Sequence, residues 1–308
     1  MHPRIAFRLT LLATFPALFT LAAPAALDMP AIGETVGVKP TLTPDGVVKI
    51  AYPRKEIEVK IDGVPLRPFA GLTSWAAFKE TPEGAMAMGD TVLFEDEITP
   101  AIDAAFSAGL EITALHNHFL YDQPKVYFMH IGGIGPAIEL ARGVRQVWNA
   151  VRAVRVTSPT LSTDFGGAAP REGTVNPAPL EEALGLKGAV EDGMVKFTIG
   201  RDAEMHGIPI GGSMGLTTWA AFTGTDEAAA MDGDVIMTGP EVQPVLRALR
   251  RSSIYIVALH NHMIDEEPAF YFVHFWGKGP AKELATGLKS VLDVQKAVGK
   301  PEMKDHNK

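Results

Sequence analysis

The chain has 308 residues, of which 46% are hydrophobic and 21% are charged. This length suits about two domains, and the composition is typical of a folded globular protein rather than a disordered one. The formal net charge is -8 and no run is rich in lysine and arginine, so we expect no nucleic-acid partner. There is no cysteine, which excludes disulfides, thiolate metal sites, iron–sulfur clusters and cysteine nucleophiles.

Residues 1–26 have the pattern of a secretory signal peptide. Arg4 and Arg8 precede an apolar stretch at 9–21, and small residues follow at 22–26. The apolar stretch is too short for a membrane span, which needs roughly 20 residues. We therefore predict cleavage near Ala25 or Ala26, a soluble mature protein without a stable membrane span, and a periplasmic or secreted location.

The rest of the chain contains an internal repeat. A shift of 144 residues aligns 71–141 with 215–285 without a gap, and 32 of these 71 positions are identical. This identity is far above chance, so we predict two homologous tandem repeats. Ser, Thr, Gly and Pro are frequent between the repeats, as in a linker. The predicted organisation is a signal peptide at 1–26, repeat 1 at 27–156, a linker at 157–176, repeat 2 at 177–300 and a polar C-terminal tail at 301–308.

Each repeat combines strand-like and helix-like patterns. Apolar residues alternate or cluster in short stretches that predict strands. In the first repeat these strands are predicted at 47–50, 57–61, 73–78, 91–94, 110–119 and 125–131. Helical spacing predicts helices at 100–108 and 136–154, and at 244–251 and 280–298 in the second repeat. We therefore expect an α+β fold in which each repeat has a mostly antiparallel sheet with two helices, and the repeats have a pseudo-twofold arrangement.

Six of the nine histidines recur with the same spacing in the two repeats. They are His116, His118 and His130 in the first repeat, and His260, His262 and His274 in the second. Residues i and i+2 of a strand share one face. A hairpin symmetric about Pro124 or Pro268 would place the second and third histidines opposite each other, with Cβ atoms about 4.5–5.5 Å apart. We therefore predict a three-histidine metal site in each repeat.

A carboxylate follows each His-x-His pair by four residues. It is Asp122 in the first repeat and Glu266 in the second, with Glu267 next to it. We predict Asp122 and Glu266 as catalytic groups that act as metal ligand or general base. The cofactor expected from three nitrogens and one oxygen is a divalent metal, zinc first, with iron, manganese and copper as alternatives.

A structural role for the histidines stays open beside the metal site. Neutral imidazoles can also form a hydrogen-bond network with one another and with the backbone. Asp90 and Asp234 each follow a glycine and are predicted to make turn hydrogen bonds. Glu97 and Glu241 are predicted to lie at helix N-termini, where a carboxylate is stabilised.

Several motifs together resemble those of the LppY/LpqO family, a duplicated exported bacterial domain of unknown function. They are GLTSWAAF at 71–78, MGD at 88–90, TALHNH at 113–118 and VQPVL at 242–246. The resemblance covers most of the mature chain and implies export and duplication, but no activity. Family members named as lipoproteins carry a lipid-modified cysteine, which this chain lacks, so the resemblance implies a free soluble form.

Two hypotheses for function follow. The first is an exported soluble metal-binding protein with one site in each repeat or one shared centre, with hydrolase or oxygenase activity as its enzymatic version. The second is a metal-free periplasmic solute-binding or interaction protein in which the histidines form a structural network. The expected partners are an unknown small-molecule substrate or the metal ion itself.

Overall fold

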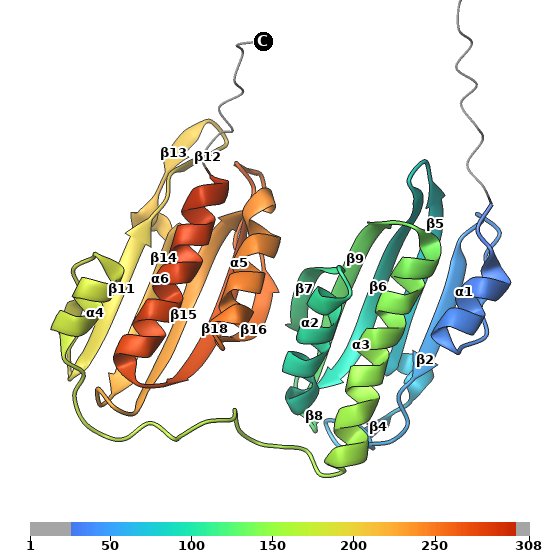
Figure 1. Ribbon diagram of the computed structural model, residues 1–308, viewed down its shortest axis with the longest axis horizontal. Helices are drawn as coiled ribbons and strands as arrows, with labels where there is room; N and C mark the ends of the chain where they lie inside the picture. Colours follow the sequence, from blue (N-terminus) through green and yellow to red (C-terminus); the bar gives the residue numbers. More distant parts are fainter. Residues whose placement is uncertain (1–25, 300–308) are drawn as a thin grey trace, which may run out of the picture.

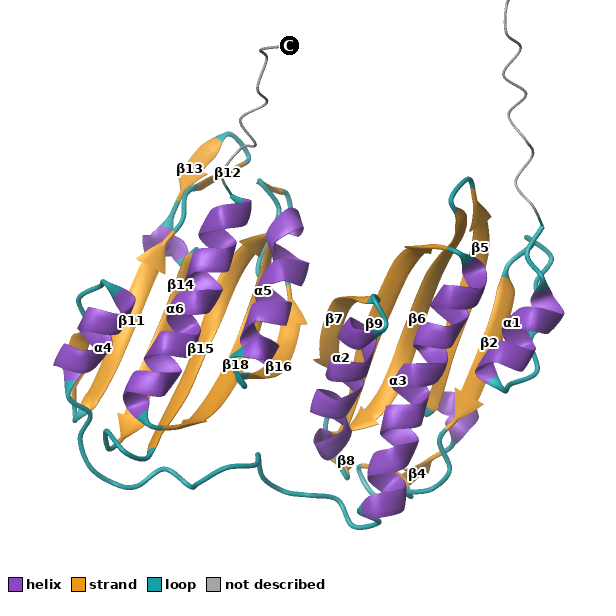
Figure 2. Cartoon of the chain, viewed as in Figure 1, coloured by secondary structure: helices purple, strands orange, loops and turns teal. Residues whose placement is uncertain are grey.

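The computed structural model describes residues 26–299, which form two adjoining halves (Figure 1). Twelve strands form one antiparallel sheet, and the helices cover one of its faces (Figure 2). We call the opposite face, which carries Met88 and His130, the open face. The predicted signal peptide lies outside the described residues, apart from Ala26.

The first half contains three helices and nine strands. They are α1 (Met29–Val36), β1 (Thr41–Leu42), β2 (Val48–Pro53), β3 (Val59–Ile61), β4 (Val64–Leu66), β5 (Thr73–Thr81), β6 (Gly84–Phe94), α2 (Ile98–Ser107), β7 (Glu111–Asn117), β8 (Asp122–Gln123), β9 (Val126–Gly135) and α3 (Ala137–Thr157).

The second half repeats this order. It contains α4 (Pro177–Leu184), β10 (Ala189–Glu191), β11 (Met194–Gly200), β12 (Ala203–Met205), β13 (Ile208–Ile210), β14 (Thr217–Gly224), β15 (Ala229–Thr238), α5 (Gly239–Arg251), β16 (Tyr255–His260), β17 (Glu266–Glu267), β18 (Phe270–Gly279) and α6 (Ala281–Val298). Residues 158–176 join the halves without a helix or strand.

Strand pairing in the second half has the same register as in the first. The sheet runs β1-β2-β5-β6-β9-β7 and continues with β16-β18-β15-β14-β11-β10. Asp90 pairs with His130, and Asp234 pairs with His274 at a constant offset of 144 residues. Both halves also have a register shift at the same place. It lies between Ile112 and Ala114 in β7, and between Ile256 and Ala258 in β16. Residues 144 apart therefore occupy equivalent places in the sheet.

The two halves meet at the centre of the sheet. Leu115 of β7 pairs with Leu259 of β16, and both leucines lie in one continuous hydrophobic core. Helix α5 reaches across this junction, where Arg247 donates to the carbonyl oxygens of Phe106 (2.9 Å) and Leu110 (3.1 Å). Apolar burial and charge-assisted hydrogen bonds thus hold the halves together.

Two small sheets cover part of the open face. Strands β4, β3 and β8 form one of them, and β13, β12 and β17 form the other. Val59 of β3 packs with Val92, Phe94 and Phe128 of the large sheet in a separate small core. These side chains alternate with those that face the helices, as the period of a strand requires.

The helix count differs from the prediction, because each half has three helices rather than two. Helix α1 follows Asp28, whose side chain accepts a hydrogen bond from Ala31 N (3.0 Å), and Gly37 ends the helix in the left-handed conformation. Asn176 and Gly185 do the same for α4. Both helices have eight residues. The capping residues and the prolines at their N-termini indicate helices, but a stretch of this length shows too little hydrophobic periodicity to predict one.

The strands and longer helices lie near their predicted positions. Strand β6 begins at Gly84 rather than at residue 91, because its first half is rich in Gly, Ala and Met, which do not have strong β-propensity. Helix α5 begins at Gly239, five residues before the predicted start. None of the helices described between residues 26 and 299 has the length and apolar character needed to cross a membrane.

Candidate metal centre

The first histidine triplet gathers on the open face, near the end of β7 and the middle of β9. His116 and His118 come from β7 and the turn after it, and His130 comes from β9. One ring nitrogen of each residue lies within 4.8 Å of one ring nitrogen of the other two. The centroid of the His116 ring lies 5.1 Å from the centroids of both other rings. Three imidazoles thus surround a single point.

The register that brings them together differs from the predicted one. His130 pairs with Ala114 rather than lying opposite His118, and His116 pairs with Phe128. The centre of the hairpin explains the difference, since the pairs from Ala114–His130 to Asn117–Tyr127 are symmetric about residue 122 and not about Pro124. His118 therefore reaches the cluster from beyond the end of β7.

The second triplet has the same geometry. The ring nitrogens of His260, His262 and His274 also lie within 4.8 Å of one another. The ring centroid of His260 is 5.1 Å from those of His262 and His274. His116 and His260 each directly follow the leucine that pairs β7 with β16. The two triplets therefore lie on neighbouring central strands, as two separate clusters rather than one shared set of six.

Neighbouring groups fix the orientation of the rings. Nδ1 of His116 donates to the carbonyl oxygen of Asn117 (3.2 Å), which leaves Nε2 as the nitrogen with a free lone pair. His260 makes the same bond to Asn261. The His118 ring stacks on Phe128 with 3.3 Å between ring centroids. These contacts restrict the imidazoles before any ligand arrives.

Burial and mutual repulsion favour neutral imidazoles. Burial, and then the nearby His116 and His130, lower the pKa of His118 to about 4. The pKa of His262 is lowered by burial and by His260 and His274. A histidine must be neutral to bind a metal, so these shifts favour the ligating form near neutral pH.

A buried carboxylate beside each triplet was not predicted as part of the site. Asp234 Oδ2 lies 3.6 Å from His262 Nε2 and 4.0 Å from His274 Nε2. Asp90 occupies the equivalent place on β6, paired with His130. Oδ1 of each aspartate is buried without a hydrogen-bond partner among the described residues. Each aspartate therefore has one unused oxygen beside a triplet, although neither aspartate is a member of the clusters defined by ligand distance.

The turn role predicted for these aspartates is wrong, because both lie inside long strands. The pKa of Asp90 and of Asp234 is raised, because burial raises it more than the nearby histidines lower it. The Gly-Asp pair that recurs in both halves was the feature of the sequence that could have indicated a place for these aspartates in the site. Its glycine allows close packing, since a Cβ on Gly89 would lie 2.9 Å from the carbonyl oxygen of Trp75. Only the strand register shows that the aspartate faces the histidines.

Asp122 and Glu266 begin the short strands β8 and β17 and are not members of the clusters defined by ligand distance. Asp122 Oδ2 accepts from Val126 N (2.8 Å), and its Oδ1 accepts from Lys125 Nζ (3.0 Å). Glu266 Oε1 accepts from Phe270 N (2.8 Å). Both carboxylates are buried and stabilise the turn that leads into β9 or β18. Their catalytic role stays a prediction.

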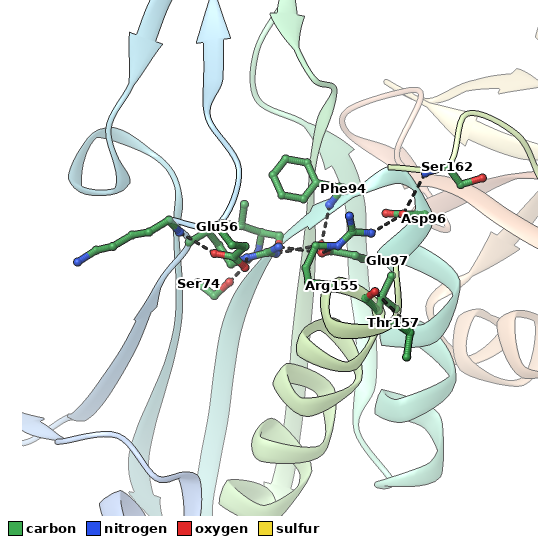
Figure 3. Close-up of polar contacts among 12 residues, drawn as sticks. Glu56, Ser74, Phe94, Asp96, Glu97, Arg155, Thr157 and Ser162 are labelled. Atoms are coloured by element: carbon green, nitrogen blue, oxygen red, sulfur yellow. Dashed lines mark hydrogen bonds and ion pairs between the residues drawn. The ribbon is translucent and has the colours of Figure 1, made fainter. Parts of the chain in front are cut away.

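The glutamates at the helix N-termini form ion pairs. Glu97 lies fully buried before α2 and accepts two hydrogen bonds from Arg54, at 2.8 and 2.9 Å. Arg155 of α3 also contacts Glu97 and Asp96 (Figure 3). Glu241 pairs with Arg201 in the second half. These clusters tie the helices to the sheet and are separate from the triplets.

Solved structures give little information about function. The chain is similar to the trimeric bacterial microcompartment shell protein PduB, with a TM-score of 0.20, 10% identity, and coverage of 83% of this chain and 89% of that one. It is also similar to the double-ringed trimeric shell protein MSM0271 from the RMM microcompartment, with a TM-score of 0.18, 11% identity, and coverage of 81% and 95%. TM-scores this low carry no argument about what the chain does.

No curated protein sequence matches the chain significantly. A family model matches it in two segments, residues 30–150 and 178–294. These segments contain one triplet each and together span well over half of the sequence. The chain belongs to the family described as Domain of Unknown Function (DUF1259), which it matches twice.

Proposed function

We propose that the protein binds a divalent transition metal in each half through His116, His118 and His130, and through His260, His262 and His274. The convergence of three ring nitrogens within 4.8 Å, found twice, is the observation that carries this proposal. Three imidazoles are a common donor set for zinc, and also suit iron, manganese or copper. We favour zinc.

The aspartate beside each cluster supports a cation rather than an empty polar site. An unpaired buried carboxylate oxygen is costly, and a metal ion would satisfy it directly or through a bound water. Asp90 and Asp234 are thus candidates for the fourth ligand or for the group that orients it. Asp122 and Glu266, held in loop hydrogen bonds, would act only after those bonds break.

The hydrogen-bond pattern argues against the metal-free alternative. In a structural network the imidazoles would bond to one another, yet no hydrogen bond joins two members of a triplet among residues 26–299. The bonds present run from Nδ1 of His116 and of His260 to a backbone carbonyl and leave Nε2 free to bind a metal. This is the arrangement by which proteins orient metal-binding histidines.

The exposure of the site favours an enzyme over a purely structural metal. His118 and His262 are exposed, so a metal held by three nitrogens would keep a position accessible to water or substrate. A bound divalent metal would supply Lewis acidity or an activated water. We propose that Asp90 and Asp234 would accept a proton there, in a metal-dependent hydrolase or oxygenase reaction.

We further propose that the protein is exported, and that its halves are duplicated repeats related by an approximate twofold axis. The matching strand registers support the duplication. Residues 1–26 and their apolar stretch support export to the periplasm or out of the cell. The repeated motifs also support the narrower assignment to the LppY/LpqO family.

The test is metal content of the mature protein, purified without a histidine tag and measured by mass spectrometry. We expect about one metal per triplet, one equivalent lost in His116→Ala, and the other lost in His260→Ala. His206→Asn is the matched control, since His206 is exposed, lies outside both triplets, and has a positive φ that asparagine tolerates.

Protein that takes up no metal from added Zn²⁺, Fe²⁺, Mn²⁺ or Cu²⁺ would refute the proposal. Equal metal loss in His206→Asn would also refute it, because the ligands would then lie elsewhere. If His116→Ala unfolds, the milder His118→Gln, at an exposed position, tests the same cluster.

A further inference from the structure

A pocket of about 260 Å³ lies where α2 of the first half approaches β16 of the second. Asp96 and Thr99 line it from the first half, and Tyr255 and Ile256 line it from the second. The segment between the halves, with Phe165, forms a further wall. None of the triplet histidines contributes to this pocket. Its volume is near the lower end for small-molecule sites and suits a small ligand.

On the opposite side of the junction, a side chain occupies the equivalent place. Gln243 Nε2 donates to the carbonyl oxygen of Ile112 (2.7 Å), and Ile112 N donates to Gln243 Oε1 (3.1 Å). The carboxamide thus pairs in a bidentate manner with the backbone edge of β7 that faces away from β9. Counterparts 144 positions away are Thr99 for Gln243 and Ile256 for Ile112. Threonine is too short to reproduce this pairing.

The backbone of Ile256 is therefore left without a partner on that side. Ile256 pairs with Phe275 just as Ile112 pairs with Ile131, so its N–H and C=O point away from β18 toward the first half. No side chain or loop in the described part of the chain hydrogen-bonds to either group. The pocket thus offers one donor and one acceptor, spaced for a planar amide.

The pocket wall also contains a largely buried carboxylate. Asp96 lines the pocket, and its side chain is only 10% exposed. Its Oδ2 contacts Arg155 and accepts from Ser162 N (3.1 Å), as Figure 3 shows. Its Oδ1 is buried without a partner. This oxygen is closed to a ligand, and Asp96 contributes negative charge to this wall of the pocket.

The remaining walls suit a flat and uncharged molecule. The rings of Phe165 and Tyr255 lie 4.7 Å apart, and Tyr255 donates from its hydroxyl to the carbonyl oxygen of Gly166 (3.3 Å). Lys278 Nζ donates to the carbonyl oxygen of Phe165 (2.6 Å) and holds the segment over the second half. Two further acidic residues, Glu95 and Asp164, line the pocket, so a carboxylate ligand would be repelled.

We propose that this pocket is a binding site for a small neutral molecule with a primary carboxamide or cyclic amide edge. The amide pairs with the backbone of Ile256 as Gln243 pairs with Ile112. The flat part of the ligand lies against Tyr255 and Phe165. The first half therefore has a ligand where the second half uses its own glutamine.

The test is titration with nicotinamide and uracil, followed by the backbone amide resonances of the isotope-labelled protein. EDTA is present, so the outcome is independent of the proposed metal sites. We expect the Ile256 amide proton to shift downfield, as it does on gaining an acceptor. Nuclear Overhauser contacts should connect the nicotinamide ring to Tyr255 and Thr99. Nicotinate, an anion without the amide donor, should bind at least about tenfold more weakly.

Thr99→Gln is the variant that separates this pocket from other sites. The new glutamine is the same residue that fills the equivalent place across the junction, so it should block the pocket and abolish the Ile256 shift. Equal binding to this variant, equal binding of nicotinate, or no binding of either amide at millimolar concentration would overturn the proposal. The contacts to Tyr255 in the wild-type protein keep the test valid if the variant does not fold.

Discussion

The two halves are most alike at the histidine triplets and least alike where they meet. The triplets share residue types, register and ring spacing. The first histidine of each lies between a leucine and an asparagine. At the junction, the position of Gln243 in the second half is occupied by Thr99 in the first. A site that works separately in each half can keep the same residues twice. A junction between two copies has only one geometry, and its two sides have different neighbours in the connecting segment.

The buried ion pairs show a second difference of the same kind. In the first half, Arg54 is 2% exposed, Glu97 is fully buried, and Arg155 adds a second cation. In the second half, Arg201 is 30% exposed, and Gln295 takes the place of the second cation near Glu241. The first cluster is therefore further removed from water, and its charges depend more strongly on one another.

Replacing Arg54 or Arg201 by methionine should show this difference most clearly. Arg54→Met leaves Glu97 buried with only Arg155 to balance it, and we expect a loss of about 3 kcal/mol in the free energy of unfolding. Arg201→Met should cost about 1 to 2 kcal/mol, because water already reaches this pair. Urea unfolding followed by circular dichroism measures both. Equal losses would mean that the two clusters are equally screened.

The aspartates beside the triplets provide the next comparison. If they orient or complete the metal site, Asp234→Asn should weaken metal binding by about 10- to 100-fold. The effect of Asp90→Asn should be smaller, because ion-pair distances to the histidines occur at Asp234 and not at Asp90. Competition with a chromophoric zinc chelator measures both affinities. Unchanged affinity in both variants would remove the aspartates from the site.

Gln243 and Thr99 allow the junction itself to be tested. Gln243→Ala removes two hydrogen bonds and leaves the Ile112 backbone unpaired, so we expect a loss of about 1 to 2 kcal/mol. Thr99→Ala should change stability by less than about 0.5 kcal/mol, since no equivalent bonds are lost. Thermal unfolding of the two variants beside the wild type gives the comparison. A larger loss in Thr99→Ala would show that its side of the junction is already filled.

Much of the site could be predicted from the sequence, because its residues are local. A His-x-His pair on a strand and a third histidine on the next strand must lie near one another once a hairpin forms. The same histidine spacing in the second half supported this prediction. The α+β class followed from the same alternation of strand-like and helix-like stretches.

The parts that were missed depend on register and on contacts between distant strands. The centre of the hairpin, at residue 122 rather than at Pro124, decides which residue faces His130, and no local pattern marks it. Asp90 comes from β6, 40 residues before His130 in the chain, so only the sheet brings it to the site. The pairing of Gln243 with Ile112 likewise requires knowledge of how the halves meet.

The last prediction concerns acid, and it tests whether the charge of Glu241 stabilises the second half. Burial raises the pKa of Glu241, but hydrogen bonds from Arg201 and Thr238 N outweigh it and hold the pKa below 4.5. A carboxylate with a lowered pKa in the folded state stabilises the protein above its unfolded pKa. This contribution is lost as pH falls through the folded value. Glu241→Gln should therefore cost about 1 kcal/mol at neutral pH and approach the wild type in strong acid. Urea midpoints over this pH range measure the difference, with the exposed Glu283→Gln as a control that should follow the wild type throughout. A gap between Glu241→Gln and the wild type that persists in strong acid would mean that shape, and not charge, holds Arg201 in place.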